Sequence, residues 1–345
     1  MSINIKSLGI TNRFNGVDIQ QSRDFVKVYN KSYIEKILKD KGWLDAQIPG
    51  NHKRHIPMHN DPEYNTEIDT ATPIPLNELP SIQKEFGFSY KQGIGELIYA
   101  LVTCRPDISY PLIKLSQYST KPARLHFEAV RGIFQYLKDT KDEGIYFWRT
   151  KPRHDCPIVA HPNTLTDYNN YTPHESKNTD NADIFKMQVD ASYCGVVTHR
   201  RSVTGMIGKL AGGTITYKTK FQDTVALSST EAEFIAACDA GKTCLYIRSI
   251  LDDLGIAQEE ATILYEDNKG AISMANVGHP TKRTKHIDTR YFALQSWIEE
   301  DLLHLMHIPT TDNSSDAMTK NTPRLLFNRH TDFILGRTVP AYVQL

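Results

Sequence analysis

The second half of the chain alternates short apolar runs with longer amphipathic segments, and this order constrains the fold most. Three strand patterns, the last two joined through Gly212 and Gly213 as a hairpin, precede a long helix with Ser229 or Thr230 as its cap. Strands and helices then alternate to a last helix that opens near Ser315. The expected strands are 185–192, 202–218 (two), 262–266 and 302–309, and the expected helices are 228–254, 269–277 and 288–300. The order predicts an α/β fold in which helices pack on a mixed sheet.

The first half is expected to be mainly helical. Helical spacing of apolar residues covers 31–41, 93–104 and 123–140, and a short apolar hairpin is expected around 3–17. Residues 49–80 hold six prolines, which helices and central strands tolerate poorly because each proline lacks a backbone donor. We expect this stretch to run extended over a surface.

A polar segment divides the two halves. A length of 345 residues favours about two domains, and residues 150–184 are rich in Pro, Asn, Thr and Asp without a sustained apolar period. We therefore predict domains at 1–149 and 185–336, joined by a linker at 150–184.

Composition limits the function classes. Forty Lys and Arg balance 40 Asp and Glu, so a nucleic-acid partner would be held by local patches and not by overall charge. Five cysteines, with no C-x-x-C pair, favour free thiols over a disulfide scaffold or a zinc ribbon. The chain shows neither a long apolar run nor a signal-peptide pattern at its start, which predicts an intracellular protein without a membrane partner.

Four acids lie where predicted elements begin or end: Asp190, Glu233, Asp267 and Asp316. Acids from separate elements can meet at one rim of a sheet, and hard cations such as Mg²⁺ take oxygen ligands. A pair of such ions supports phosphodiester hydrolysis. Taken singly, Asp316 at a helix start favours a helix-dipole partner or a cap, and Asp190 or Asp267 could each be a turn former.

Local sequence in this half resembles one family closely. This half contains, in order, the strings RRSVTGMIGKLAGGTITYKTKFQDTVALSSTEAEFIA, LYEDNKGAI, RTKHIDTRY and HIPTTDNSSDAMTK. Together they resemble the ribonuclease H (RNase H) domain of Ty1/copia-type retrotransposon polyproteins, over about residues 186–320. The resemblance implies an RNase H-like mixed five-stranded sheet with flanking helices. It also implies that Asp190, Glu233, Asp267 and Asp316 are catalytic residues that hold two Mg²⁺ ions, for which Mn²⁺ is a possible substitute.

The second acid of this set requires a choice between Glu231 and Glu233. Residues two apart on a helix point about 200° apart, so only one of them can face the metals. Glu233 is chosen because its A-E-aromatic-I-A string resembles retroviral RNase H domains, which leaves Glu231 as a solvated first-turn acid. The first motif departs from the family, with Ser192 where a second Asp is usual and Tyr193 where Trp is usual.

The first half resembles the segment between the polymerase palm and the RNase H domain of copia-type reverse transcriptases. The resemblance covers about residues 88–147, includes the T-x-R-P-D-I and Y-L-K-x-T strings, and extends more weakly toward the end of the palm and the thumb. It implies a mainly helical thumb and connection remnant. Residues 250–253 (ILDD) imitate a polymerase aspartate pair but lie late in the long predicted helix. We therefore expect no polymerase activity from this chain alone, and other retroelement Pol parts are possible partners that would supply the palm.

The implied partner is an RNA/DNA hybrid. Ser192 and Asn268, beside two of the acids, are candidates for contacting the RNA sugars, whose 2′-hydroxyl distinguishes RNA from DNA. The candidate phosphate contacts are Lys282, Arg283 and Lys285 in the densest basic run, and Lys53, Arg54, Lys121, Arg124 and Arg131 in the first half. Each of these could instead be an ordinary solvated charge.

The leading hypothesis is a retroelement RNase H that cuts the RNA strand of hybrids, located in a cytoplasmic retroelement particle or in the nucleus. The alternative is a catalytically inactive remnant that only binds a duplex, in which the acids survive by descent.

Overall fold

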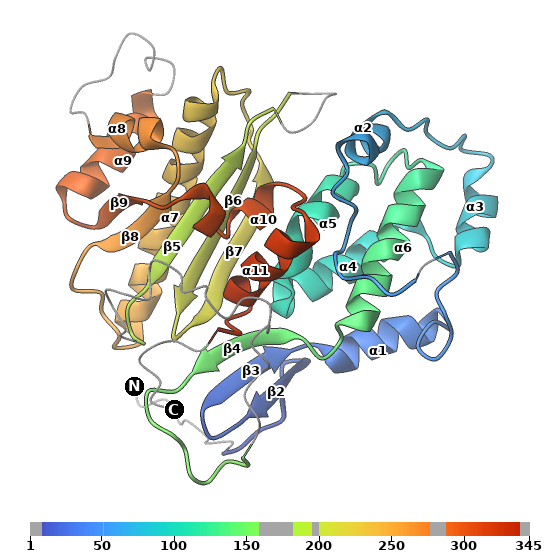
Figure 1. The fold of residues 1–345 in the computed structure, drawn as a ribbon, viewed down its shortest axis with the longest axis horizontal. Coiled ribbons are helices and arrows are strands. Elements are labelled where there is room, and N and C mark those ends of the chain that lie inside the picture. The colour runs from blue at the N-terminus through green and yellow to red at the C-terminus, as the bar shows by residue number, and fades with distance from the viewer. Residues whose placement is uncertain (1–8, 51, 159–181, 195–199, 277–287, 339–345) are drawn as a thin grey trace, which may run out of the picture.

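The computed structural model describes residues 9–50, 52–158, 182–194, 200–276 and 288–338. Within these ranges a helical part with a small antiparallel sheet lies beside a larger mixed sheet that carries its own helices (Figure 1). No helix in the described part is both long and apolar enough to cross a bilayer.

The larger sheet has five strands in the order β7-β6-β5-β8-β9. Strands β5, β6 and β7 form an antiparallel meander, whereas β8 runs parallel to β5 and β9 parallel to β8. Ala211 and Gly212 turn the β6–β7 hairpin with φ of 50° and 72°, the left-handed values that a tight two-residue hairpin requires. The strands are β5 (Lys186–Ser192), β6 (Val203–Leu210), β7 (Gly213–Phe221), β8 (Thr262–Glu266) and β9 (Leu303–His307). The predicted α/β fold with a mixed five-stranded sheet is confirmed.

Helices cover both faces of this sheet (Figure 1). On one face, helix α7 packs its Phe234, Ala237 and Cys244 against Val189 and Leu264 in a single apolar core. On the other face, Met318 and Ile334 pack with Ile207. The helices of this part are α7 (Ser229–Asp253), α8 (Lys269–Asn276), α9 (Asp288–Glu299), α10 (Asp316–Thr319) and α11 (Arg324–Ile334), with a 3₁₀ turn η5 (Thr310–Asp312).

The cap of α7 differs from the prediction. Ser228, not Ser229 or Thr230, precedes the helix with extended backbone, and its hydroxyl accepts from the backbone N–H of Glu231 (3.1 Å). Glu231 in turn accepts from the N–H of Leu227 through Oε2 (2.8 Å). Ser228 thus satisfies a donor that the first helical turn leaves unpaired, and Glu231 binds the backbone just before the cap, so together they fix where α7 begins.

The first part is mainly helical, as expected, but it also contains a sheet of four antiparallel strands, β1-β2-β3-β4. Only a hairpin was predicted here, around residues 3–17, of which 3–8 lie outside the described residues. The observed β1–β2 hairpin turns at Asn15 and Gly16. The elements are β1 (Arg13–Phe14), β2 (Val17–Gln21), β3 (Phe25–Tyr29), β4 (Gly144–Trp148), α1 (Lys31–Asp40), α2 (Pro62–Thr70), α3 (Leu79–Phe86), α4 (Tyr90–Cys104), η1 (Pro106–Ile108), α5 (Ser109–Ser116) and α6 (Arg124–Asp139).

The proline-rich stretch is not extended throughout, so that expectation was wrong for α2 and for the start of α3. Pro62 is the first residue of α2, where Asp61 caps the helix by accepting from the N–H of Glu63 (2.9 Å). Pro80 is the second residue of α3. In the first turn of a helix a missing N–H costs nothing, because those donors have no partner within the helix.

The two parts are joined by backbone hydrogen bonds along β4. The N–H of Tyr146 donates to Leu335 O (2.8 Å), and that of Trp148 donates to Ala211 O (2.9 Å). The indole Nε1 of Trp148 donates to Gly336 O (2.8 Å). Residues just after α11 and in the β6–β7 turn therefore lie against the first part. The predicted boundaries at 1–149, 150–184 and 185–336 stay predictions, and residues 159–181 of the predicted linker are outside the described residues.

Candidate active site

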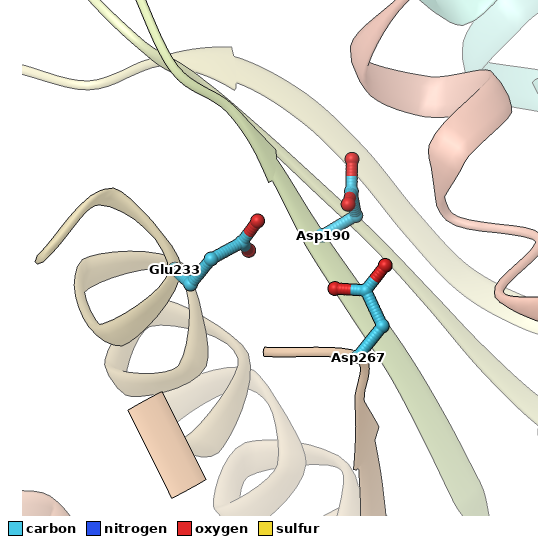
Figure 2. Close-up of side chains that lie close together, drawn as sticks. All are labelled: Asp190, Glu233 and Asp267. Atoms are coloured by element: carbon cyan, nitrogen blue, oxygen red, sulfur yellow. The ribbon is translucent and has the colours of Figure 1, made fainter. Parts of the chain in front are cut away.

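Three of the four predicted acids meet at one end of the mixed sheet. Asp190 lies in β5, Glu233 in the first turns of α7 and Asp267 directly after β8. One carboxylate oxygen from each lies within 4.8 Å of the others. Figure 2 shows Glu233 reaching from its helix toward the two aspartates. Asp190 and Glu233 are buried, and Asp267 is half-buried.

The alternation of β5 explains where Asp190 lies. Its neighbours Val189 and Ala191 belong to the apolar core under α7, and successive strand residues point to opposite faces. Asp190 is accordingly directed to α10, where the hydroxyl of Thr319 donates to its Oδ2. Helix α10 can approach β5 this closely because Gly205, paired with Asp190 on β6, has no side chain.

Asp316, the fourth predicted acid, lies beside this group at the first residue of α10. It is buried, and its Oδ1 is 2.5 Å from Nζ of Lys320, one helical turn further on. Its charge still reaches the other acids, because after burial it is the largest cause of the raised pKa of Asp190. The structure therefore brings three acids together and places the fourth next to them in an ion pair.

Burial and mutual repulsion raise the pKa of Asp190 and of Glu233. Burial, followed by the charge of Asp316, raises the pKa of Asp190 to about 7. Burial, followed by the charge of Asp190, raises the pKa of Glu233 to about 11. Carboxylates this close stay ionised together only when a positive charge joins them.

A fifth acid, Glu266, belongs to the same neighbourhood and was missed from the sequence. It ends β8 with no exposed surface, and its Oε1 accepts from the N–H of Asn268 (2.9 Å). Burial raises the pKa of Glu266 well above its usual range, and the charges of Asp267 and Asp190 add to this effect. The available signal was the pair of consecutive acids that ends TILYED.

The donor set fits a divalent cation. Oε2 of Glu233 and Oε2 of Glu266 are buried and have no hydrogen-bond partner among the described residues. Leaving a buried carboxylate oxygen without a partner is costly unless a cation or a proton satisfies it. Hard oxygen ligands from several carboxylates are what Mg²⁺ and Mn²⁺ prefer.

Glu231 is not the solvated acid that was expected. It is buried at the start of α7, where its carboxylate binds the N–H of Leu227. Of the two glutamates, Glu233 is the one that lies with Asp190 and Asp267.

Comparisons with known proteins identify relatives that align with most of the chain. No family model matches it. It is 28% identical over 332 residues to the retrovirus-related Pol polyprotein of transposon TNT 1-94 from Nicotiana tabacum, covering 94% of this chain and 22% of that protein. It is also 28% identical over 270 residues to the Pol polyprotein of transposon RE2 from Arabidopsis thaliana, covering 76% of this chain and 16% of that protein.

The chain is a homologue of the Ty1/copia-type retrotransposon Pol polyproteins. This Pol homologue spans about a fifth of the length of the two relatives named above. Among solved structures it is similar to LC11-RNase H1, isolated from compost, with 13% identity, a TM-score of 0.32, and coverage of 40% of this chain and 93% of that one.

The structure describes only two of the five nucleic-acid contacts that were predicted in the second half of the Pol homologue, Ser192 and Asn268. Ser192 ends β5 and is half-buried. Asn268 caps α8, because its Oδ1 accepts from the N–H of Ala271 (3.0 Å), so its position also fixes the start of that helix. The basic residues Lys282, Arg283 and Lys285 lie outside the described residues.

Proposed function

We propose that this Pol homologue is a metal-dependent nuclease that hydrolyses the RNA strand of RNA/DNA hybrids. The observation that carries the proposal is the convergence of Asp190, Glu233 and Asp267, which each place one carboxylate oxygen within 4.8 Å of the others. One buried oxygen of Glu233 has no hydrogen-bond partner among the described residues. Homology to retrotransposon Pol polyproteins supports a hybrid as the substrate class.

Asp190, Glu233, Asp267 and Asp316 would hold two Mg²⁺ ions during the reaction, and Mn²⁺ is the expected substitute. When bound, Mg²⁺ supplies Lewis acidity toward the phosphate and makes a water a better nucleophile. The protein's own contribution is positional. Thr319 holds Asp190 from α10 through a hydrogen bond, and α7 carries Glu233 just after its capped first turn.

The described part of the chain also narrows the list of possible phosphate contacts in the first half. Arg124 forms ion pairs with Glu85 and Glu128, and the guanidinium of Arg131 lies 4.7 Å from the ring centroid of Phe86. Lys53 and Lys121 are exposed. We infer that these two lysines are better placed than Arg124 and Arg131 to contact the backbone of a bound duplex, where contacts to phosphates carry no sequence information.

The test is cleavage of a hybrid whose RNA strand carries a 5′ label, in Mg²⁺ and in EDTA. The wild-type chain is expected to shorten the RNA in Mg²⁺ only. Glu233→Gln should reduce the rate by at least about a hundredfold, since it removes a ligand charge from the centre. Glu231→Gln is the matched control on the same helix turn, because a glutamine there can still accept from Leu227 N–H, and it should cleave at nearly the wild-type rate.

The same assay distinguishes a nuclease from the alternative, an inactive remnant. A catalytically inactive remnant that only binds a duplex would retard the hybrid in a gel without shortening it, and the departure at Ser192 and Tyr193 from the usual motif makes that outcome worth testing. Primer extension is expected to be absent without the palm from other Pol parts. A cytoplasmic retroelement particle or the nucleus is the location that we propose.

A further inference from the structure

Lys320 is a positive charge placed on the rim of the acidic centre. Its Nζ lies 2.5 Å from Oδ1 of Asp316, four residues earlier. The lysine side chain is 46% exposed, whereas that of Asp316 is 4% exposed. The ammonium group therefore binds a buried carboxylate from a partly solvated position.

Lys320 interacts electrostatically with the acids of three elements. Besides Asp316 at the start of α10, the charges of Asp190 on β5 and Asp267 after β8 act on its ammonium group. Among the ion pairs of the described residues, the one with Asp316 is the one that involves a predicted metal ligand. The centre thus divides into three acids that lie together, Asp190, Glu233 and Asp267, and a fourth that is already neutralised.

We propose that Lys320 is a built-in counter-ion that keeps the Asp316 side of the centre closed to a second divalent ion until a nucleic-acid phosphate draws the ammonium group away. The inference rests on the proposed function, because it concerns the same acids. It predicts that the substrate-free protein binds one divalent ion and that the second site opens with the substrate.

The chemistry of lysine supports this role. An ammonium group and a divalent cation repel each other and compete for the same carboxylate oxygen. The long, flexible stem of a half-exposed lysine lets the ammonium group move to another anion without disturbing the backbone, and a phosphate is a suitable anion. The backbone near Lys320 is fixed, since Thr319 is bonded to Asp190 and Asn321 Nδ2 donates to His59 O (3.1 Å).

The experiment counts bound Mn²⁺ by the electron paramagnetic resonance signal of the free ion, which needs no catalysis. The wild-type chain without nucleic acid is expected to bind one ion, and Lys320→Gln two, with the affinity of the second raised at least about tenfold. Lys320→Arg keeps the charge and should bind one. The control is Lys220→Gln, since Lys220 is similarly exposed but pairs with Asp223 (2.6 Å).

A second arm adds a hybrid with a 2′-O-methyl RNA strand, which resists cleavage, and should raise the wild-type count from one to two. Two ions on the wild-type chain without nucleic acid would overturn the proposal, and so would one ion on a folded Lys320→Gln variant. The wild-type counts test the proposal even if that variant does not fold. If the wild-type chain binds two ions without nucleic acid and still cleaves the hybrid, the proposed function stands and this inference fails. If the chain binds no ion and cleaves nothing, both are refuted.

Discussion

Neutralising one acid of the centre should stabilise the metal-free protein while removing its function. The pKa of Asp190 is raised from 3.8 to about 7, chiefly by burial and then by Asp316. Each tenfold change in proton affinity corresponds to about 1.4 kcal/mol, so the ionised group costs the folded state about 4 kcal/mol above pH 7. Asp190→Asn removes that cost, and its amide oxygen can still accept the bond from Thr319.

The sign of the pH dependence follows from the raised pKa. The folded state binds the proton more tightly than the unfolded chain, so this stabilisation is complete below pH 3.8 and is lost as the pH rises through about 7. Between pH 5 and pH 8 the wild-type chain should lose about 3 kcal/mol of unfolding free energy from this group. The variant should not show that loss.

Urea unfolding in EDTA at pH 5 and pH 8 measures the effect. At pH 8 Asp190→Asn should be more stable than the wild-type chain by about 2 to 4 kcal/mol, whereas Asp252→Asn, an exposed acid late in α7, should change stability by less than about 0.5 kcal/mol. Adding Mg²⁺ should stabilise the wild-type chain more than the variant. An Asp190→Asn variant no more stable than the wild-type chain at pH 8, or equally stabilised at both pH values, would show that ionised Asp190 does not destabilise the folded state.

Three further substitutions test the framework around the centre. Glu231→Ala removes a first-turn partner of α7 and should lower the unfolding free energy by about 1 kcal/mol in urea while hybrid cleavage persists; loss of cleavage would contradict the assignment of Glu233. Gly205→Ala places a Cβ 2.6 Å from Cγ2 of Thr319, so it should displace α10 and lower the unfolding free energy by about 1 to 3 kcal/mol. It should also weaken Mn²⁺ binding in the electron paramagnetic resonance titration, and unchanged binding would contradict a role for α10 in the centre. Trp148→Phe removes the indole bond to Gly336 and should lower the unfolding free energy by about 1 kcal/mol in urea, and an unchanged midpoint would show that this junction contributes little.

Periodic apolar spacing was enough to predict most elements of the second half. The pattern over residues 228–254 predicted α7 to within a residue at each end, and Gly212 marked the β6–β7 hairpin. The mixed sheet followed because three strands before the long helix and two after it leave few other arrangements. These signals are local, so a single sequence contains them.

Features that depend on distant partners could not be predicted in the same way. Strand β3 pairs with β4, more than a hundred residues away, and neither was identified as a strand because no local signal shows which segments will meet. Glu266 was overlooked because an acid at the end of a strand is normally solvated, and only the packing of β8 between β5 and β9 buries it. The extended conformation of residues 49–80 was predicted from the number of prolines alone. Pro62 and Pro80 lie in the first turn of a helix, where proline is tolerated.

Two strings that carried the resemblance in the first half turn out to contact each other. Arg105 donates to Asp107 through Nε (2.9 Å) and to Thr140 O through Nη1 (3.0 Å). Tyr136 OH donates to Asp107 Oδ2 (2.7 Å). This buried network joins α4 to the end of α6, so T-x-R-P-D-I and Y-L-K-x-T form one structural unit, which spacing alone could not reveal.

Carboxylates from separate elements should form one cation site, and a crystal of the chain soaked in Mn²⁺ can show the ion there. We expect an anomalous scattering peak with Asp190, Glu233 and Asp267 as its protein ligands. A well-diffracting soaked crystal with no peak among these three side chains, or with peaks only elsewhere on the surface, would contradict the account.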